Sequence, residues 1–127
     1  MRYIKYFMTT IAIASAIAFA NINTFASATS RELVGECKLT FYCPCRSCSE
    51  GWGNKTSTGT YAKQGRTIAV DPSIIPYGST VYIEGWGYYT AEDCGGGIKG
   101  NHIDIYRDNH SACDRLGVKH AKVYIVD

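Results

Sequence analysis

The sequence predicts a small, mostly-β barrel with one short helix. Two observations predict it: short segments in which apolar and polar residues alternate, and turns rich in Gly and Pro between those segments. No long connection is expected between the segments, which favours a barrel over a layered α/β fold. The segments expected to form strands are 38–42, 67–70, 80–84, 88–92, 102–106 and 119–126.

Periodicity and local signals justify these elements one by one. Apolar side chains occupy every second position in several segments, as half-buried strands require: Val81 and Ile83, Ile103 and Ile105, and Ala121, Val123 and Ile125. Residues that bend the backbone or permit positive φ occur in the connections 75–79, 85–87 and 95–97. A helix is expected at about 111–116, with Asn109 as its N-cap and Gly117 as the residue that ends it.

The N-terminus indicates export. Arg2 and Lys5 precede an apolar run of 14 residues (7–20), and residues 26–28 read Ala-Ser-Ala. This order is typical of a secretory signal peptide with an A-x-A cleavage site. The run is shorter than the roughly 20 residues that span a bilayer, so an uncleaved membrane anchor is the less favoured alternative. We expect removal of residues 1–28 and one domain over 29–127, without stable membrane insertion.

The charge balance excludes one class of partner. Removal of residues 1–28 takes away two basic residues and no acidic one, which leaves 11 Lys and Arg against 11 Asp and Glu. A neutral chain without a basic tract lacks the positive excess that a phosphate backbone requires. Nucleic acid is therefore not an expected partner.

The cysteines allow two interpretations. An even number in an exported chain favours structural disulfides, which we expect here. Alternatively, the cluster Cys43-Pro-Cys45-Arg-Ser-Cys48 could supply metal thiolates, with Cys94 as a distant fourth ligand, although its spacing is only half of a usual zinc pattern. All six cysteines follow residue 28: Cys37, Cys43, Cys45, Cys48, Cys94 and Cys113.

Three aspartates interrupt or close the β-like apolar runs, where a carboxylate is costly unless it is satisfied. Asp71 stands before a proline, Asp93 before Cys-Gly-Gly, and Asp104 between two isoleucines. Each has a simple structural explanation: a turn at Asp71, an Asx turn at Asp93 and a solvent-facing strand position for Asp104. Their spacing of 22 and then 11 residues makes them candidates for a shared site.

The surrounding residues carry a family resemblance. The chain reads T-I-A-V-D-P-S-I-I-P-Y-G-S-T-V-Y-I-E-G-W-G, then A-E-D-C-G-G-G-I-K-G-N-H-I-D-I-Y, and then G-V-K-H-A-K-V-Y-I. These stretches resemble the 3D domain, named for its three aspartates, which occurs in secreted Gram-positive cell-wall proteins and in the catalytic barrel of MltA-type lytic transglycosylases. The match extends from about residue 39 to residue 127, and the resemblance implies a six-stranded double-psi β-barrel.

The resemblance also implies a function. It implies a secreted lytic transglycosylase that cleaves the β-1,4 bond between N-acetylmuramic acid and N-acetylglucosamine in peptidoglycan strands, without water or a cofactor, and leaves 1,6-anhydro ends. By position, Asp104 matches the family's catalytic acid, while Asp93 and Asp71 match the aspartates that shape and support the site. Two positions depart from the family pattern, with Gly97 where alanine is usual and His102 where arginine is common.

The pattern of residues 102–106 supports this chemistry on its own. Alternation places the two isoleucines on one face and Asp104, with His102 and Tyr106, on the other. An aspartic acid there can protonate the glycosidic oxygen and then take the proton of the sugar's own C6 hydroxyl. One carboxyl group suffices, unlike the pair in ordinary glycosidases. We expect its pKa to be raised by partial burial and by one of the other two aspartates.

Other residues are candidates for sugar contacts. Aromatic rings stack on sugars, Thr58 lies in a Thr-Ser-Thr-Gly segment that resembles the family's Thr-Ala-Thr-Gly, and polar residues flank the glycine turn. The alternatives are aromatic residues in the core and a lysine that is only solvated. The candidates are Trp52, Thr58, Tyr61, Lys99 and Asn101.

Two functions from other classes compete with the enzyme. The same barrel could be a non-catalytic wall-binding module, because a fold does not specify an activity. A thiolate metal or redox protein built on Cys43, Cys45 and Cys48 is the less favoured alternative. Cys37 and Cys113 fall outside the 3D motif, and their pairing in a disulfide is a further hypothesis.

Overall fold

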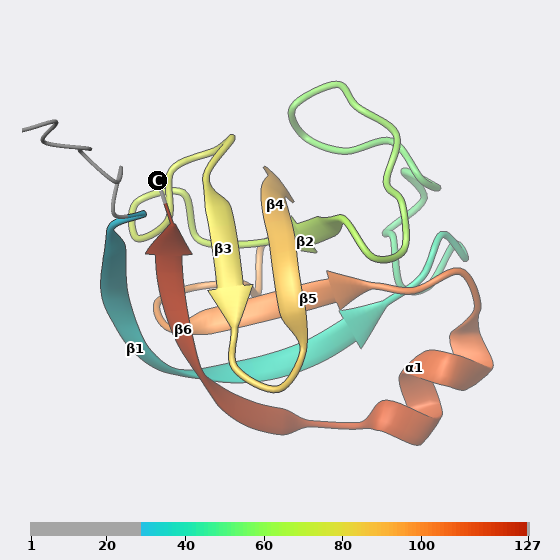
Figure 1. Cartoon of the computed structure of the whole chain (residues 1–127). Coiled ribbons are helices and arrows are strands. Elements are labelled where there is room, and N and C mark those ends of the chain that lie inside the picture. The colour runs from blue at the N-terminus through green and yellow to red at the C-terminus, as the bar shows by residue number, and fades with distance from the viewer. Residues whose placement is uncertain (1–28, 127) are drawn as a thin grey trace, which may run out of the picture.

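The computed structural model describes residues 29–126 and shows a closed barrel with the strand order β1-β5-β2-β4-β3-β6 (Figure 1). Within this range, the prediction of a six-stranded, mostly-β barrel with one short helix is confirmed. The expected signal peptide lies outside the described residues. No helix within them is long and apolar enough to cross a membrane. The elements are β1 (Arg31–Tyr42), β2 (Thr67–Ala69), β3 (Thr80–Ile83), β4 (Gly87–Asp93), β5 (His102–Tyr106), α1 (His110–Leu116) and β6 (Lys119–Val126).

Strand β1 organises the sheet because it pairs on both sides. It runs parallel to β5, with Thr40 opposite Asp104, and antiparallel to β6 along most of its length. It begins seven residues before the predicted segment 38–42. The added residues are mostly exposed and do not alternate, and a register shift between Leu33 and Gly35 interrupts their pairing. Backbone pairing with β6, rather than a side-chain pattern, therefore extends this strand.

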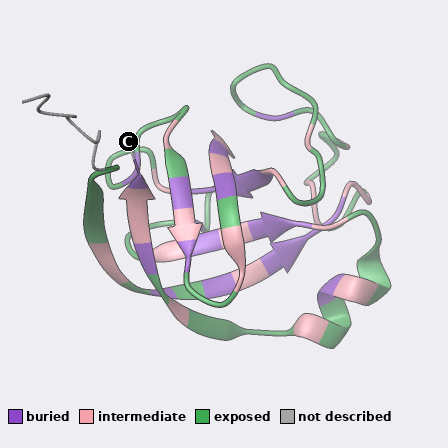
Figure 2. Ribbon diagram, viewed as in Figure 1, coloured by how far each residue is buried: buried purple, intermediate pink, exposed green. Residues whose placement is uncertain are grey.

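The alternating apolar residues fill the interior of the barrel, as predicted, and Figure 2 shows buried positions recurring along the strands. Burying each such side chain contributes about 1.5–3 kcal/mol relative to leaving it exposed. A second, smaller group of buried residues consists of Tyr42, Ala69, Ile98 and Tyr106. The fully buried aliphatic side chains of the main core are Leu39, Ile68, Val70, Val81, Ile83, Ile103, Ile105 and Val123.

Helix α1 is confirmed together with both of its caps. The Asn109 side chain accepts a hydrogen bond from the Ala112 backbone N–H at 2.9 Å. At the other end, Gly117 has φ 61° and donates its backbone N–H to the Cys113 carbonyl. The helix packs against β1, so its first residue, His110, is held close to the segment that follows Tyr42.

The expectation of short connections is wrong for residues 43–66. This segment joins β1 to β2 through turns, and an isolated bridge between Lys55 and Tyr61 is its β-structure. In Figure 1 it forms the green loop that projects beyond the barrel. Its abundance of Gly, Ser and Thr supplies turns but few apolar side chains for packing. Long irregular segments of this kind are commonly functional.

The expectation of structural disulfides is not met, because all six cysteines are free thiols in the described residues. Cys37 and Cys113, the hypothetical pair, are both buried in the main core without a bond between them. Cys94 is exposed, and its sulfur lies 3.1 Å from the Ser57 hydroxyl. The remaining three cysteines gather at one place, which is described below.

Candidate active site

A cleft of about 840 Å³ lies where the 43–66 segment faces the barrel. This volume is in the range of ordinary ligand pockets. Strand residues Tyr42, Ala69, Asp93 and Asp104 contribute to it, and the glycine turn that follows β4 forms part of its lining. Two of the three predicted aspartates, Asp93 and Asp104, therefore share one cavity.

Asp104 is held in this cleft by the alternation of β5. Its neighbours Ile103 and Ile105 are fully buried in the barrel, so Asp104 points to the opposite face, where it is half-buried. Burial raises its pKa to about 6, the Thr40 hydroxyl opposes this shift, and the nearby Asp93 carboxylate adds to it. A pKa near 6 lets one carboxyl group serve as an acid and, after losing its proton, as a base near neutral pH.

Thr40 connects Asp104 to His102. The Thr40 hydroxyl oxygen lies 3.0 Å from Asp104 Oδ1 and 2.8 Å from His102 Nε2, while His102 Nδ1 lies 3.2 Å from the Gly97 carbonyl oxygen. Because a carbonyl oxygen only accepts, His102 must carry a proton on Nδ1. Burial lowers the pKa of His102, which favours a neutral ring whose Nε2 accepts from the Thr40 hydroxyl while Asp104 holds the remaining proton. The three side chains form one hydrogen-bonded path.

Asp93 is a fully engaged hydrogen-bond acceptor. Its Oδ1 accepts from the Ser57 backbone N–H and hydroxyl and from the Cys94 N–H, at 2.9, 2.7 and 2.9 Å. Its Oδ2 accepts from the Tyr42 hydroxyl at 2.9 Å. These bonds join the 43–66 segment to β4 and β1. Asp93 thereby positions the wall of the cleft and places a carboxylate near Asp104.

Asp71 lies outside the cleft lining. Its Oδ1 accepts from the Ser73 N–H and hydroxyl, and its Oδ2 accepts from the Gly100 N–H at 2.9 Å. The Gly100 N–H is the largest cause of its lowered pKa. The Asp71 carboxylate thus forms the expected turn and fastens the end of the glycine turn, whereas Asp93 is the carboxylate that raises the pKa of Asp104.

Like the aspartates, the candidate sugar-binding residues lie partly inside and partly outside the cleft lining. Trp52 and Lys99 line the cleft, and the Trp52 side chain is 73% exposed. Thr58 donates to the Glu92 carbonyl, and Asn101 lies against β1 through a 3.5 Å contact from its Nδ2 to the Glu36 carbonyl. Tyr61 is 67% exposed and outside the lining. The cleft therefore brings together two of the five candidates.

The sequence pattern did not indicate every residue of the site. Thr40 and Tyr42 were expected only as strand residues, yet they bond to Asp104 and Asp93 respectively. Tyr106, expected on the same face of the strand as Asp104, is buried in the smaller apolar group. The parallel register between β1 and β5 places Thr40 opposite Asp104, and no local sequence pattern indicates that register.

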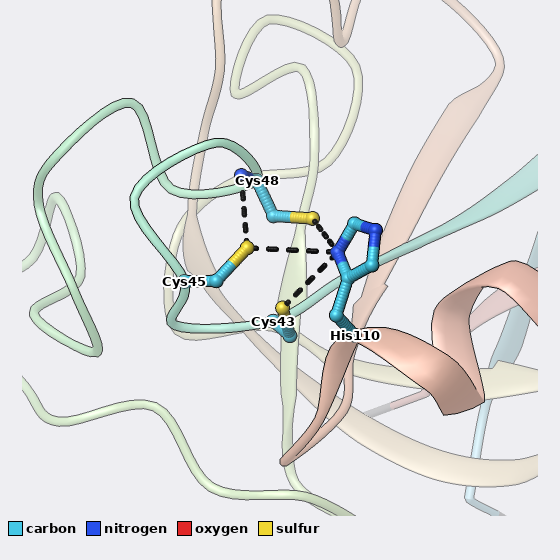
Figure 3. Close-up of side chains that lie close together, drawn as sticks. All are labelled: Cys43, Cys45, Cys48 and His110. Atoms are coloured by element: carbon cyan, nitrogen blue, oxygen red, sulfur yellow. Dashed lines mark hydrogen bonds between the residues drawn. The ribbon is translucent and has the colours of Figure 1, made fainter.

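A second cluster lies beside the cleft. The sulfur atoms of Cys43, Cys45 and Cys48 lie 3.8, 3.6 and 3.3 Å from His110 Nδ1 (Figure 3). The Cys48 backbone N–H lies 3.4 Å from Cys45 Sγ and is the largest cause of the lowered Cys45 pKa, about 6. Burial raises the pKa of Cys43, and it raises that of Cys48 to about 11. Cys94, the expected fourth ligand, is not part of this group, and His110 takes that place.

Residues 66–127, just under half of the chain, match the family model of the 3D domain, which confirms the resemblance noted from the sequence. The stretch matched by the model includes all three aspartates and begins after the 43–65 part of the long connection.

Two relatives from Bacillus subtilis (strain 168) support this resemblance. The chain is 44% identical over 84 residues to YabE, whose name refers to cell wall shaping, and covers 20% of that protein. It is 48% identical over 62 residues to the cell wall-binding protein YocH and covers 22% of it. These matches include 64% and 49% of this chain. The chain therefore spans about a fifth of the length of each relative.

Solved structures show a similar fold. The lytic transglycosylase MltA of Escherichia coli superimposes with a TM-score of 0.50 at 28% identity, over 57% of this chain and 27% of MltA. MltA with bound chitohexaose matches with the same TM-score at 27% identity, again over 57% of this chain and 27% of MltA.

Proposed function

We propose that this protein is a secreted lytic transglycosylase that cleaves peptidoglycan glycan strands in the cell wall. The observation that carries the proposal is Asp104, a half-buried carboxyl group in the cleft with its pKa raised to about 6. The 3D domain, the cell-wall names of the relatives and the chitohexaose-bound MltA support a glycan as the substrate. Export through residues 1–28 and action outside the cell are part of the same proposal.

In the first step of the proposed reaction, protonated Asp104 donates its proton to the glycosidic oxygen as the bond from that oxygen to C1 of N-acetylmuramic acid breaks. In the second, the O6 hydroxyl of the same sugar attacks C1, and its proton returns to the Asp104 carboxylate. The C1–O4 bond is replaced by a C1–O6 bond, which closes the 1,6-anhydro ring. Asp104 ends protonated, as it began, and water is not consumed.

The neighbours of Asp104 support both steps. The Thr40 hydroxyl donates to the ionised carboxylate, and the neutral His102 ring lies at the other end of the hydrogen-bonded path. Burial is the main cause of the raised pKa of Asp104, and Asp93 adds to it while bracing the cleft wall through Ser57 and Tyr42. Asp71 acts at one remove, by fastening the glycine turn at Gly100.

The cleft surface provides for sugar binding. The exposed ring of Trp52 offers a flat apolar face on which a sugar can stack. Lys99 on the glycine turn offers a positive charge to the carboxylate of a muramic acid lactyl group or stem peptide. Tyr61, Thr58 and Asn101 lie outside the lining, and as part of the same proposal they would contact a glycan that extends beyond the cleft.

A wall-binding module is the second candidate, because YocH is named a cell wall-binding protein. A binding module needs the exposed Trp52 ring but has no use for a carboxyl group of raised pKa. The two candidates therefore differ in their products rather than in their affinity for the wall.

The test is to incubate the purified protein with peptidoglycan sacculi and to identify the soluble fragments by mass spectrometry. Fragments that end in 1,6-anhydro-N-acetylmuramic acid support the transglycosylase. Fragments with reducing ends would make water the nucleophile and overturn the proposed reaction. Retention on sacculi without soluble fragments would favour the binding module.

A further inference from the structure

We infer that Cys43, Cys45, Cys48 and His110 form a structural zinc site that fastens one wall of the cleft to the barrel. The four ligand atoms lie within 4.8 Å of one another. In Figure 3, three sulfur atoms gather around a single ring nitrogen, Nδ1 of His110. The site is separate from Asp104 and from the proposed reaction, and it is a property of the fold.

The sulfur-to-nitrogen distances fit tetrahedral zinc. With Zn–S bonds near 2.3 Å and Zn–N bonds of 2.0–2.1 Å, a tetrahedron places sulfur and nitrogen ligands about 3.6 Å apart. The three sulfur-to-nitrogen distances are 3.3, 3.6 and 3.8 Å, which bracket this value. A disulfide between two of the cysteines would leave the third sulfur and the imidazole without a reason to converge. Four protein ligands with no open position are typical of structural rather than catalytic zinc.

Two of the ligand atoms also have supporting contacts. His110 Nε2 lies 3.4 Å from Asp114 Oδ2, one helical turn further along α1. A carboxylate that accepts the Nε2–H leaves the lone pair of Nδ1 free to bind a metal, as in the usual carboxylate–histidine–zinc arrangement. The Cys48 N–H, directed at Cys45 Sγ at 3.4 Å, stabilises negative charge on that sulfur. Both contacts prepare their ligand atoms for a cation.

The position of the site indicates which parts of the fold a bound metal would stabilise. Cys43 directly follows β1, Cys45 and Cys48 begin the 43–66 segment, and His110 begins α1. This long segment has few apolar side chains to hold it, yet it supplies Trp52 and Ser57 to the cleft. Cys48 itself is part of the cleft lining. A metal bound here would link the cleft wall to the helix and strand behind it, and it would add to the packing of the three cysteines against the main core.

The experiment measures metal directly, without reference to activity. The purified chain, refolded with zinc and desalted, should contain about one zinc per molecule by inductively coupled plasma mass spectrometry. Cobalt in place of zinc should give the visible bands of tetrahedral cobalt–thiolate. Cys45→Ser and His110→Ala should each lower zinc affinity at least tenfold, and Asp114→Ala should lower it up to about tenfold.

Matched controls separate this site from general thiol or imidazole binding. Cys94→Ser and His120→Ala change an exposed cysteine and an exposed histidine outside the cluster, and both should keep one zinc per molecule. In the unaltered protein, a chelator should expose three further thiols to alkylation, which tests the site even if a variant fails to fold. Metal well below one equivalent, or a disulfide mapped between two of Cys43, Cys45 and Cys48 in the native protein, would overturn the inference. Neither result bears on cleavage by Asp104, so the two proposals fail separately.

Discussion

Three features of the fold set the pKa of Asp104. Burial favours its neutral form, Asp93 favours it further, and the Thr40 hydroxyl favours the ionised form. Each influence comes from a different strand or turn, since Thr40 lies on β1, Asp93 ends β4 and Asp104 lies on β5. Single substitutions should therefore move the pH dependence of cleavage in opposite directions.

Asp93 and Asp71 should differ in this respect. Asp93→Asn removes a negative charge near Asp104, so the pKa of Asp104 should fall. The alkaline limb of the pH–activity profile should therefore move to lower pH. Asp71→Asn should leave that pH unchanged, because its carboxylate is engaged with Ser73 and Gly100. The measurement is the rate of soluble fragment release from pH 4 to 9. Equal shifts in both variants would contradict the assigned roles.

Thr40→Val should act in the other direction. It removes the hydroxyl that stabilises the Asp104 carboxylate and interrupts the path to His102. The pKa of Asp104 should rise, so the alkaline loss of activity should move to higher pH, while the maximal rate falls. Thr80→Val, at an exposed position on β3, is the matched control and should leave the profile unchanged. An unmoved profile in Thr40→Val would argue against a role for Thr40.

At the scale of elements, α1 matters because it places His110. Asn109→Ala removes the N-cap bond to Ala112 and should lower the free energy of unfolding by about 1 kcal/mol. Urea unfolding of the two proteins measures the difference. Asn54→Ala, at an exposed site in the 43–66 segment, should change stability by less than about 0.5 kcal/mol. Equal effects of the two substitutions would show that the cap does not hold the helix.

The elements also show what the sequence could predict. Strands β5 and β6 and the caps of α1 were predictable because alternation and capping are local signals. The early start of β1 was not, since its first residues are ordered by pairing with β6. The long 43–66 connection was missed because a glycine-rich stretch has no period to indicate how it folds.

The candidate site was predictable to a similar degree. Asp104 could be assigned to a polar face because its neighbours on β5 are isoleucines. The contacts that tune it could not, since the register between β1 and β5 brings Thr40 to Asp104 across 64 positions of the chain. The same limit applies to the cysteine cluster, whose fourth member, His110, is 62 positions from Cys48.

At the scale of the whole molecule, Asp104 should reduce stability at neutral pH. Its folded pKa, about 6, lies above the ordinary value of 3.8, so folding is most favoured when it is protonated, and this contribution is lost as pH rises from about 4 through 6. At pH 8 the free energy of unfolding of Asp104→Asn, measured with urea, should therefore exceed that of the unaltered protein by on the order of 2 kcal/mol. At pH 4 the two proteins should have the same free energy of unfolding. Asp108→Asn, at an exposed position, should match the unaltered protein at both values. A destabilised Asp104→Asn at pH 8 would contradict the burial of this carboxyl group.

The central claim is that Asp104 performs the bond cleavage rather than glycan binding. The most direct measurement compares the unaltered protein with Asp104→Asn on the same sacculi, recording the fraction of protein retained and the 1,6-anhydro fragments released. We predict equal retention, with fragment release reduced at least a hundredfold in the variant. Equal release by both proteins would remove Asp104 from the reaction and would contradict the proposed mechanism.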